Sequence, residues 1–81
     1  MAVTVRLFAR LRELVGTDEI ARPVSSEATV ADVWHALVSD WPALAPYAGS
    51  VSCGVNAQYA RMTTPVADGD EVAFLPPVSG G

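Results

Sequence analysis

Lysine is absent from this sequence. All five basic residues are arginines, and nine acidic residues give the chain a net charge of −4. Without a side-chain amine, the chain cannot accept an isopeptide bond from another copy of itself except at its N-terminus. The excess of negative charge argues against binding nucleic acid through phosphate neutralisation, and it suits a basic pocket on a protein partner.

Cysteine and long apolar runs are also scarce. Cys53 is the only cysteine, so the chain cannot form an internal disulfide, and a lone thiol without a signal peptide predicts a reducing, cytoplasmic location. No apolar stretch approaches the roughly 20 residues that a membrane-spanning helix needs. Hydrophobic residues nevertheless make up 51% of the chain. One small domain with an apolar core is therefore expected, with some apolar surface left for a partner.

The spacing of apolar residues predicts an α+β domain over residues 1–75. Strands are predicted at residues 2–8, 18–24, 51–55, 59–61 and 71–75. A short helix is predicted at 9–15, with Gly16 after its last turn, and a longer helix is predicted between Thr29 and Pro42. Residues 42–50 are predicted to form a loop. The apolar face of the longer helix is expected to cover one face of the sheet.

Residues 76–81 form a tail that differs from the domain before it. Pro76 and Pro77 favour an extended conformation, while Gly80 and Gly81 have no Cβ atom to obstruct a narrow channel. The tail can span roughly 20 Å when it is extended. Glycine-rich chain ends are often simply mobile, but this one follows directly on a predicted strand. The pattern therefore predicts a tail with a rigid base, which inserts into another protein and carries the C-terminal carboxylate at its tip.

Three stretches resemble the small, sulfur-carrying subunit of molybdopterin synthase. They are FARLRELVG at residues 8–16, Val55-Asn56 in the middle, and DGDEVAFLPPVSGG at residues 68–81. The resemblance covers the whole length, and its most specific part is the Pro-Pro-Val-Ser-Gly-Gly ending. It implies a ubiquitin-like β-grasp fold, in which a mixed sheet packs on one main helix and a flexible C-terminal tail follows.

The resemblance also implies a function. In that family an E1-like activating enzyme uses ATP to adenylate the terminal glycine, here Gly81, and sulfur then replaces the adenylate to leave a thiocarboxylate. The large synthase subunit takes the tail into its active site, where the sulfur is transferred to cyclic pyranopterin monophosphate. The chain would then be a sulfur-donating subunit in molybdenum cofactor biosynthesis, without catalytic activity of its own and without a bound cofactor or metal. The tail residues expected to bind the partner are Pro76, Pro77, Val78, Ser79 and Gly80.

Two other functions use the same activated glycine. Similar sulfur carriers serve thiamine-thiazole or cysteine biosynthesis, and ubiquitin-like modifiers are joined through their terminal glycine to lysines of other proteins. The Gly-Gly tail is common to all three, so it does not separate them. A stable complex with the large subunit of molybdopterin synthase would favour the first function, whereas a ladder of conjugates would favour the modifier.

Phe8 and Leu75 are candidates for a docking surface. In regular strands each points away from its apolar neighbour, Leu7 or Phe74, and so toward the sheet face that the helix leaves free. Arg12 matches the family's Arg-Glu-Leu stretch and is a candidate for pairing with an acidic group of the partner. The alternatives are a secondary core for Phe8 and Leu75, and an ordinary solvated side chain for Arg12.

Other residues with reactive side chains are interpreted as structural. Cys53 lies in an apolar strand and is predicted to be in the core, with a sulfur-carrying thiol as the alternative. His35 is predicted on the polar side of the longer helix, without a second metal ligand at a suitable spacing. Asp68, Asp70 and Glu71 are predicted to belong to an Asp-Gly-Asp turn and the strand after it, and not to a metal site.

Overall fold

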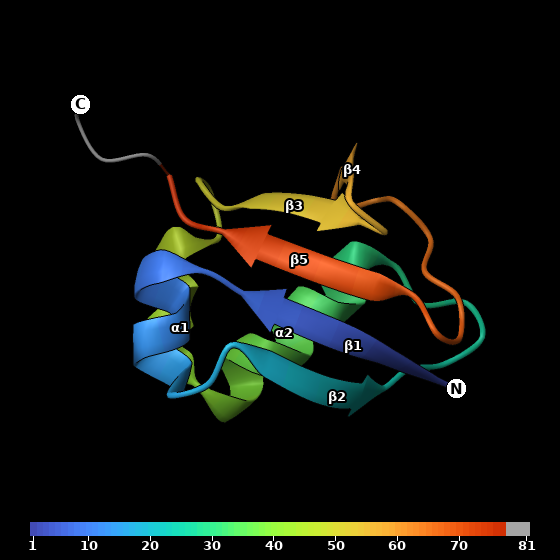
Figure 1. Cartoon of the computed structure of the whole chain (residues 1–81), viewed down its shortest axis with the longest axis horizontal. Helices are drawn as coiled ribbons and strands as arrows, with labels where there is room; N and C mark the ends of the chain where they lie inside the picture. The colour runs from blue at the N-terminus through green and yellow to red at the C-terminus, as the bar shows by residue number, and fades with distance from the viewer. Residues whose placement is uncertain (78–81) are drawn as a thin grey trace.

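The computed structural model describes residues 1–77, which form one sheet with a helix packed across one of its faces (Figure 1). The strands in this part of the chain are β1 (Ala2–Leu7), β2 (Glu19–Pro23), β3 (Ser52–Val55), β4 (Gln58–Ala60) and β5 (Glu71–Leu75). The helices are α1 (Ala9–Val15), α2 (Val30–Asp40) and the 3₁₀ helix η1 (Pro42–Tyr47). In the view of Figure 1, α2 lies behind the sheet and α1 lies at one end of it.

The strands pair in the order β2-β1-β5-β3-β4. β5, the last strand in sequence, occupies the centre, where it is parallel to β1 and antiparallel to β3. The antiparallel pairs β1–β2 and β3–β4 form the two edges of the sheet. This mixed sheet around one main helix is the ubiquitin-like β-grasp arrangement, which confirms the predicted fold.

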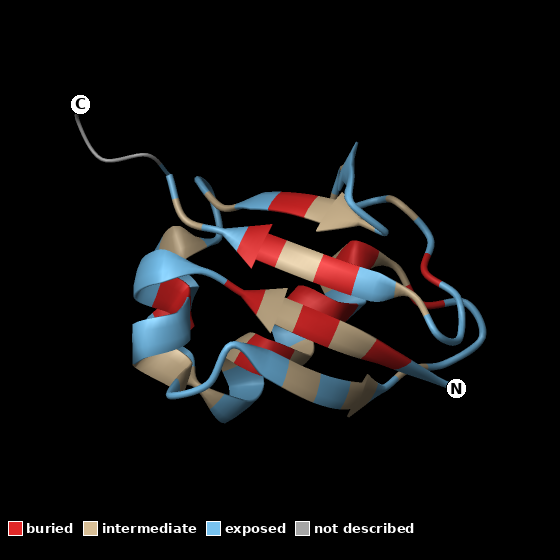
Figure 2. Ribbon diagram, in the orientation of Figure 1, coloured by how far each residue is buried: buried red, intermediate tan, exposed pale blue. Residues whose placement is uncertain are grey.

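The core lies between the sheet and α2, because alternate side chains of the strands point under the helix. Its residues include Val3, Val5, Leu7, Val72 and Phe74 from the strands and Val30, Val33, Trp34 and Leu37 from α2. The rings of Trp34 and Phe74 pack with their centroids 5.0 Å apart. Figure 2 shows the alternation along β1 and β5 as buried segments separated by more exposed ones. Burial of each large apolar side chain stabilises the fold by about 1.5–3 kcal/mol.

The start of α2 and the end of α1 both lie where the sequence predicts. The N–H and hydroxyl groups of Thr29 both donate to Asp32 Oδ2, at 2.9 and 3.2 Å, so a capping-box pair closes the first turn of α2. Gly16 adopts a left-handed conformation with φ 91° after α1, and its N–H donates to the Arg12 carbonyl at 2.8 Å. A residue with a Cβ would be strained at that φ, so glycine suits the position.

Two sequence predictions are corrected by the structure. Residues 42–50, predicted as a loop, contain η1, because Pro42 needs no N–H partner in the first turn and Leu44 is buried in the core. β1 ends at Leu7 and not at Phe8, since Phe8 is the extended N-cap residue of α1, with φ −124° and ψ 152°. The other predicted strands match the observed ones to within one residue at each end.

Candidate functional site

The predicted tail leaves the sheet from its central strand. β5 pairs with β1 as far as Phe74 on one side, and with β3 as far as Leu75 on the other. Pro76, which is half-buried, and Pro77, which is exposed, follow directly. The predicted tail residues Val78, Ser79, Gly80 and Gly81 lie outside the described residues. The described part of the chain therefore gives the tail a base that is held on both sides.

The face of the sheet opposite α2 carries exposed apolar side chains. Phe8 is 41% exposed, Leu75 is 40% exposed and Tyr59 is 96% exposed. The neighbours of the first two, Leu7 and Phe74, are fully or almost fully buried on the other face. The prediction that Phe8 and Leu75 belong to the free face is therefore confirmed, and they are not part of the core.

Phe8 and Leu75 line the same open hollow on this face, which has a volume of about 400 Å³. The residues around it are Phe8, Cys53, Gly54, Ala57, Gln58, Tyr59, Glu71, Ala73 and Leu75. Gly54 of β3 pairs with Ala73 of β5, so two small residues lie side by side in the lining. A Cβ atom on Gly54 would approach the Gln58 backbone oxygen to 3.0 Å. Concave and mostly apolar surfaces of this kind accommodate side chains of binding partners.

Tyr59 is a residue of this face that the sequence analysis missed. Asn56 and Ala57 have positive φ values of 51° and 68°, which makes them the two-residue turn of a tight hairpin between β3 and β4. In that hairpin Tyr59 pairs with Gly54 and so shares its face of the sheet. Cys53 is in the core, so the next residue, Gly54, faces the free side. A two-residue turn at Asn56 and Ala57 pairs Gly54 with Tyr59, and recognising this turn in the sequence would have placed Tyr59 on the free face.

A hydrogen-bond network lies beside the hollow, next to Glu71. The Asn56 side chain donates to Asp70 Oδ1 at 3.0 Å and accepts the N–H of Glu71 at 3.0 Å. The Ala67 N–H donates to Asp70 Oδ2 at 2.8 Å. The hydrogen bond from Asn56, and after it the one from Ala67, hold the pKa of Asp70 below its usual value, so this carboxylate is anionic at neutral pH. Two of the stretches that carried the family resemblance, far apart in sequence, thus meet at one place.

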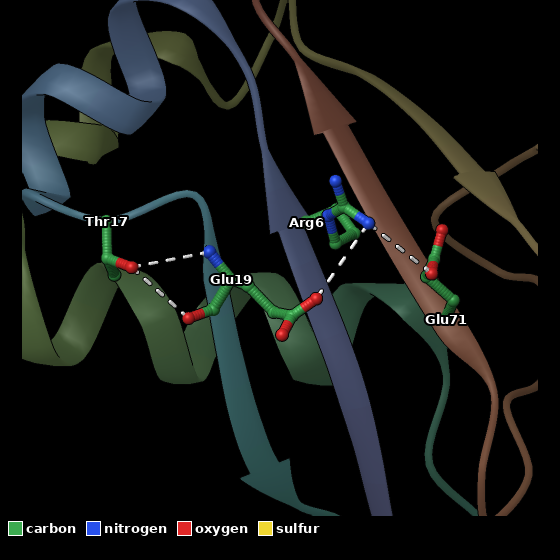
Figure 3. A network of polar contacts seen from close by, with 4 residues as sticks. All are labelled: Arg6, Thr17, Glu19 and Glu71. Carbon is green, nitrogen blue, oxygen red and sulfur yellow. Dashed lines mark hydrogen bonds and ion pairs between the residues drawn. The ribbon is translucent and has the colours of Figure 1, made fainter.

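A group of charged side chains crosses the same face of the sheet (Figure 3). Nη1 of Arg6 lies 3.8 Å from Glu19 Oε1 of β2 and 3.8 Å from Glu71 Oε2 of β5. The Thr17 hydroxyl holds the start of β2, since it donates to the Glu19 carbonyl at 3.3 Å and accepts the Glu19 N–H at 3.4 Å. The free face therefore has a charged part over β2, β1 and the start of β5, and an apolar part over the rest of β5, β3 and β4.

Three other residues with reactive side chains, Cys53, His35 and Asp68, lie where the sequence predicts. Cys53 is buried, as predicted; its thiol donates to the Ala60 carbonyl at 3.2 Å, and burial raises its pKa, which disfavours the nucleophilic thiolate. His35 is exposed on α2, also as predicted. Asp68 Oδ1 accepts the N–H of Ala2 at 2.8 Å and so ties the Asp-Gly-Asp turn to β1.

Within residues 1–77 no three His, Cys, Asp or Glu side chains are grouped closely enough to hold a metal ion. The helices that the structure describes are too short or too polar to cross a membrane.

Arg12 is placed differently from the other predicted docking residues. It is exposed on α1, and it forms no ion pair with any residue of the described range 1–77. It is not among the residues that line the hollow. The structure therefore brings Phe8 and Leu75 together and leaves Arg12 outside their site.

Comparisons with known proteins agree with this architecture. The family model described as the ThiS family matches residues 5–81. The molybdopterin synthase sulfur carrier subunit of Escherichia coli (strain K12) is 41% identical over 81 residues, which cover 98% of this chain and 99% of that protein. Small archaeal modifier protein 1 of Haloferax volcanii is 36% identical over 84 residues, covering 94% of this chain and 97% of that protein. A crystal structure of the Haloferax volcanii modifier superposes with a TM-score of 0.86 at 32% identity, covering 95% of this chain and 98% of that chain.

The family match includes the central strand and the whole of the predicted tail, and the relatives are matched over nearly their full lengths. The β-grasp sheet observed in residues 1–77 is shared with the solved structure. The chain therefore belongs to the ThiS family, and it is similar over almost its entire length to sulfur carrier subunits of molybdopterin synthase.

Proposed function

We propose that this protein is the sulfur carrier of molybdopterin synthase. In this proposal the C-terminal carboxylate of Gly81 is adenylated, converted to a thiocarboxylate, and delivered into the large synthase subunit, where the sulfur is transferred to cyclic pyranopterin monophosphate. The observation that carries the proposal is the position of β5: it is paired on both sides, and it runs directly into Pro76 and Pro77. A tail that starts from a fixed strand can place its end within a partner with less loss of conformational entropy than a free chain end.

The chemistry requires outside activation. A carboxylate is anionic at neutral pH and a poor electrophile, so one of its oxygens must first become a leaving group. Attack of a carboxylate oxygen on the α-phosphorus of ATP forms the acyl adenylate and releases pyrophosphate. Hydrosulfide then adds to the carbonyl carbon, the bond from this carbon to the AMP oxygen breaks, and AMP leaves. The product is a thiocarboxylate, and no oxidation or reduction is needed.

Two partners follow from the proposal. The activating enzyme binds ATP, so this chain needs no cofactor of its own. The large synthase subunit covers the free face of the sheet, with its apolar side chains in the hollow beside Phe8, Leu75 and Tyr59. Support comes from the name of the Escherichia coli relative, which is a subunit of the synthase, and from the exposure of these three side chains around one hollow.

The proposal is tested by mass spectrometry of the intact protein after incubation with the activating enzyme, ATP and sulfide. The wild-type chain is expected to exchange one oxygen for one sulfur. A variant with one residue added after Gly81 moves the carboxylate by about 3.3 Å. A misplacement of 1 Å can slow a reaction about 100-fold, so this variant is expected to stay uncharged while its thermal unfolding is unchanged.

The controls separate the tail from the rest of the chain. Cys53→Ser is expected to be charged like the wild type, because the sulfur is placed on the carbonyl carbon of Gly81. Gly80→Val, which adds a branched side chain in the tail, is expected to block charging without lowering the melting temperature. A wild-type chain that gains no sulfur, or a folded Cys53→Ser protein that alone loses the mass shift, would contradict the proposal.

A protein modifier is the second candidate function. It is supported by the 36% identity to small archaeal modifier protein 1. The activated glycine would then react with lysines of other proteins, and this chain, which has no lysine, would not be extended at its own side chains. A pull-down separates the candidates. A stable complex with the large synthase subunit supports the sulfur carrier of molybdopterin synthase, a ladder of conjugates supports the modifier, and capture of a thiazole or cysteine biosynthetic enzyme supports the other sulfur carriers.

A further inference from the structure

Glu71 stands at the boundary between the charged and apolar parts of the free face. Its side chain is 48% exposed. It lines the hollow together with Phe8 and Leu75 and also approaches Arg6 of β1. A protein that covers the apolar part of this face would therefore also cover Glu71.

The Glu71 carboxylate has open acceptor positions. Its backbone N–H and carbonyl are both bonded to Asn56, at 3.0 and 2.8 Å, which fixes the residue in place. The carboxylate itself accepts no hydrogen bond from residues 1–77, and its nearest cation is Arg6 Nη1 at 3.8 Å. Arg6 lies equally far from Glu19, so one positive charge is shared between two negative ones. The group of three therefore has a net charge of −1.

Asp70 increases the negative potential next to Glu71 but does not compete for a donor. Both of its carboxylate oxygens already accept hydrogen bonds, from the Asn56 side chain and from the Ala67 N–H. Glu71 is thus the acidic residue that lines the hollow, and it is held by its backbone with its carboxylate free to accept. Covering such a carboxylate without a new donor removes its water and leaves an uncompensated charge, which is strongly unfavourable.

We infer that the partner covering this face places a basic side chain, arginine or lysine, against the carboxylate of Glu71. This contact would orient the partner, because its apolar side chains must enter the hollow at the Phe8 and Leu75 end while its cation meets Glu71. The inference rests on the proposed function, since it takes the large subunit of molybdopterin synthase as the partner. Charge complementarity of this kind determines orientation and association rate, and it weakens with salt.

The test measures binding of the large subunit from the same organism to the full chain at about 0.05 M and about 0.5 M salt. Glu71→Gln keeps the size of the side chain and removes its charge. We expect this variant to bind on the order of tenfold more weakly than the wild type at low salt, and we expect a smaller difference at high salt. Glu27→Gln, in an exposed position outside the hollow, changes the net charge equally and is expected to change binding less than about twofold.

Arg6→Gln is expected to change the binding affinity in the opposite direction. Removing the guanidinium leaves Glu71 and Glu19 without their shared cation, so a basic side chain from the partner should bind more tightly at low salt. Thermal unfolding of each variant shows that the fold is retained. Equal binding by the Glu71→Gln and Glu27→Gln proteins, or tighter binding by Glu71→Gln, would overturn the inference. Weakening by Arg6→Gln to the same extent as Glu71→Gln would also overturn it, because the internal ion pair would then be what matters.

Failure of this inference can be distinguished from failure of the proposed function. If the wild-type chain does not bind the large subunit at all, both are refuted. If the wild type binds and becomes charged with sulfur while Glu71→Gln behaves like Glu27→Gln, the sulfur-carrier function stands and only the basic contact is refuted.

Discussion

The two faces of the sheet are built by the same strands and have opposite surroundings. Phe74 and Leu75 are neighbours on β5, yet Phe74 is fully buried against Trp34 whereas Leu75 is 40% exposed beside the hollow. Leu7 and Phe8 show the same contrast where β1 passes into α1. The inner face is closed by α2, and the outer face has no element of residues 1–77 packed across it (Figure 2).

The contrast implies that stability and recognition are separable in this protein. Inner-face residues lose water when the chain folds, so their substitution should change the free energy of unfolding. Outer-face residues lose water only when a partner binds, so their substitution should change the dissociation constant instead. A change on one face, or at a turn beside the hollow, can therefore be compared with a matched change elsewhere in the chain.

The largest expected effect is on stability, from Phe74→Ala. The substitution removes the ring that packs with its centroid 5.0 Å from that of Trp34, and large-to-small changes of this kind cost about 3–5 kcal/mol. Leu75→Ala, one residue further along, is expected to change the free energy of unfolding by less than about 1 kcal/mol. Urea unfolding of both variants checks the difference, and similar losses would show that the two faces are not distinct energetically.

The next effect is on binding, from Phe8→Ala and Leu75→Ala. Each removes apolar surface from the hollow beside the tail, and each is expected to weaken association with the large synthase subunit about tenfold or more while the protein stays folded. Arg12→Ala is the comparison, because Arg12 is exposed but lies outside the hollow. Titration calorimetry gives the dissociation constants. A loss in Arg12→Ala as large as that in Phe8→Ala would move the docking surface toward α1.

A smaller effect is expected at the hairpin turn beside the hollow. Ala57 has φ 68°, a left-handed conformation that is unfavourable for a residue with a Cβ atom. Ala57→Gly should therefore stabilise the protein by about 1 kcal/mol. Ala21→Gly, in the edge strand β2, should instead destabilise it by about 0.5–1 kcal/mol. Thermal unfolding of the two variants shows whether each one raises or lowers the stability, and destabilisation by Ala57→Gly would contradict the explanation.

The smallest effect concerns the pH dependence of stability at Asp70. Because hydrogen bonds lower its pKa in the folded state, Asp70 stabilises the fold above the pKa of an unfolded aspartate, about 3.9, and this contribution is lost as the pH falls through the folded pKa. The stability difference between the wild type and Asp70→Asn should therefore shrink as the pH falls from about 5 to below 4. Urea unfolding across this range measures it. Asp18→Asn is the control, because the exposed Asp18 side chain forms no hydrogen bond within residues 1–77. A stability difference between the wild type and Asp70→Asn that stays constant across this pH range would contradict the prediction.

Much of the fold could be predicted from local patterns. Alternation of apolar residues marked β1 and β5 and gave the correct faces for Leu7, Phe8, Phe74 and Leu75. Helical spacing of apolar residues between Thr29 and Pro42 marked α2. These predictions succeeded because side-chain direction within a strand or helix depends only on its own periodicity. η1 was missed because nothing local in a stretch rich in proline and alanine predicts that Leu44 is buried.

The sequence by itself determined which sides of β1, β5 and α2 face inward, where the two α-helices begin and end, and that a proline- and glycine-rich tail follows a strand. Only the tertiary structure decided that this strand is the central one, that Phe8, Leu75 and Tyr59 meet around one hollow, and that Arg12 lies outside it. It also decided that Glu71 and Glu19, from opposite ends of the described chain, share one arginine. The physical reason is that strand order and register depend on pairing between distant segments, whereas periodicity within a segment carries no information about which segment lies beside it.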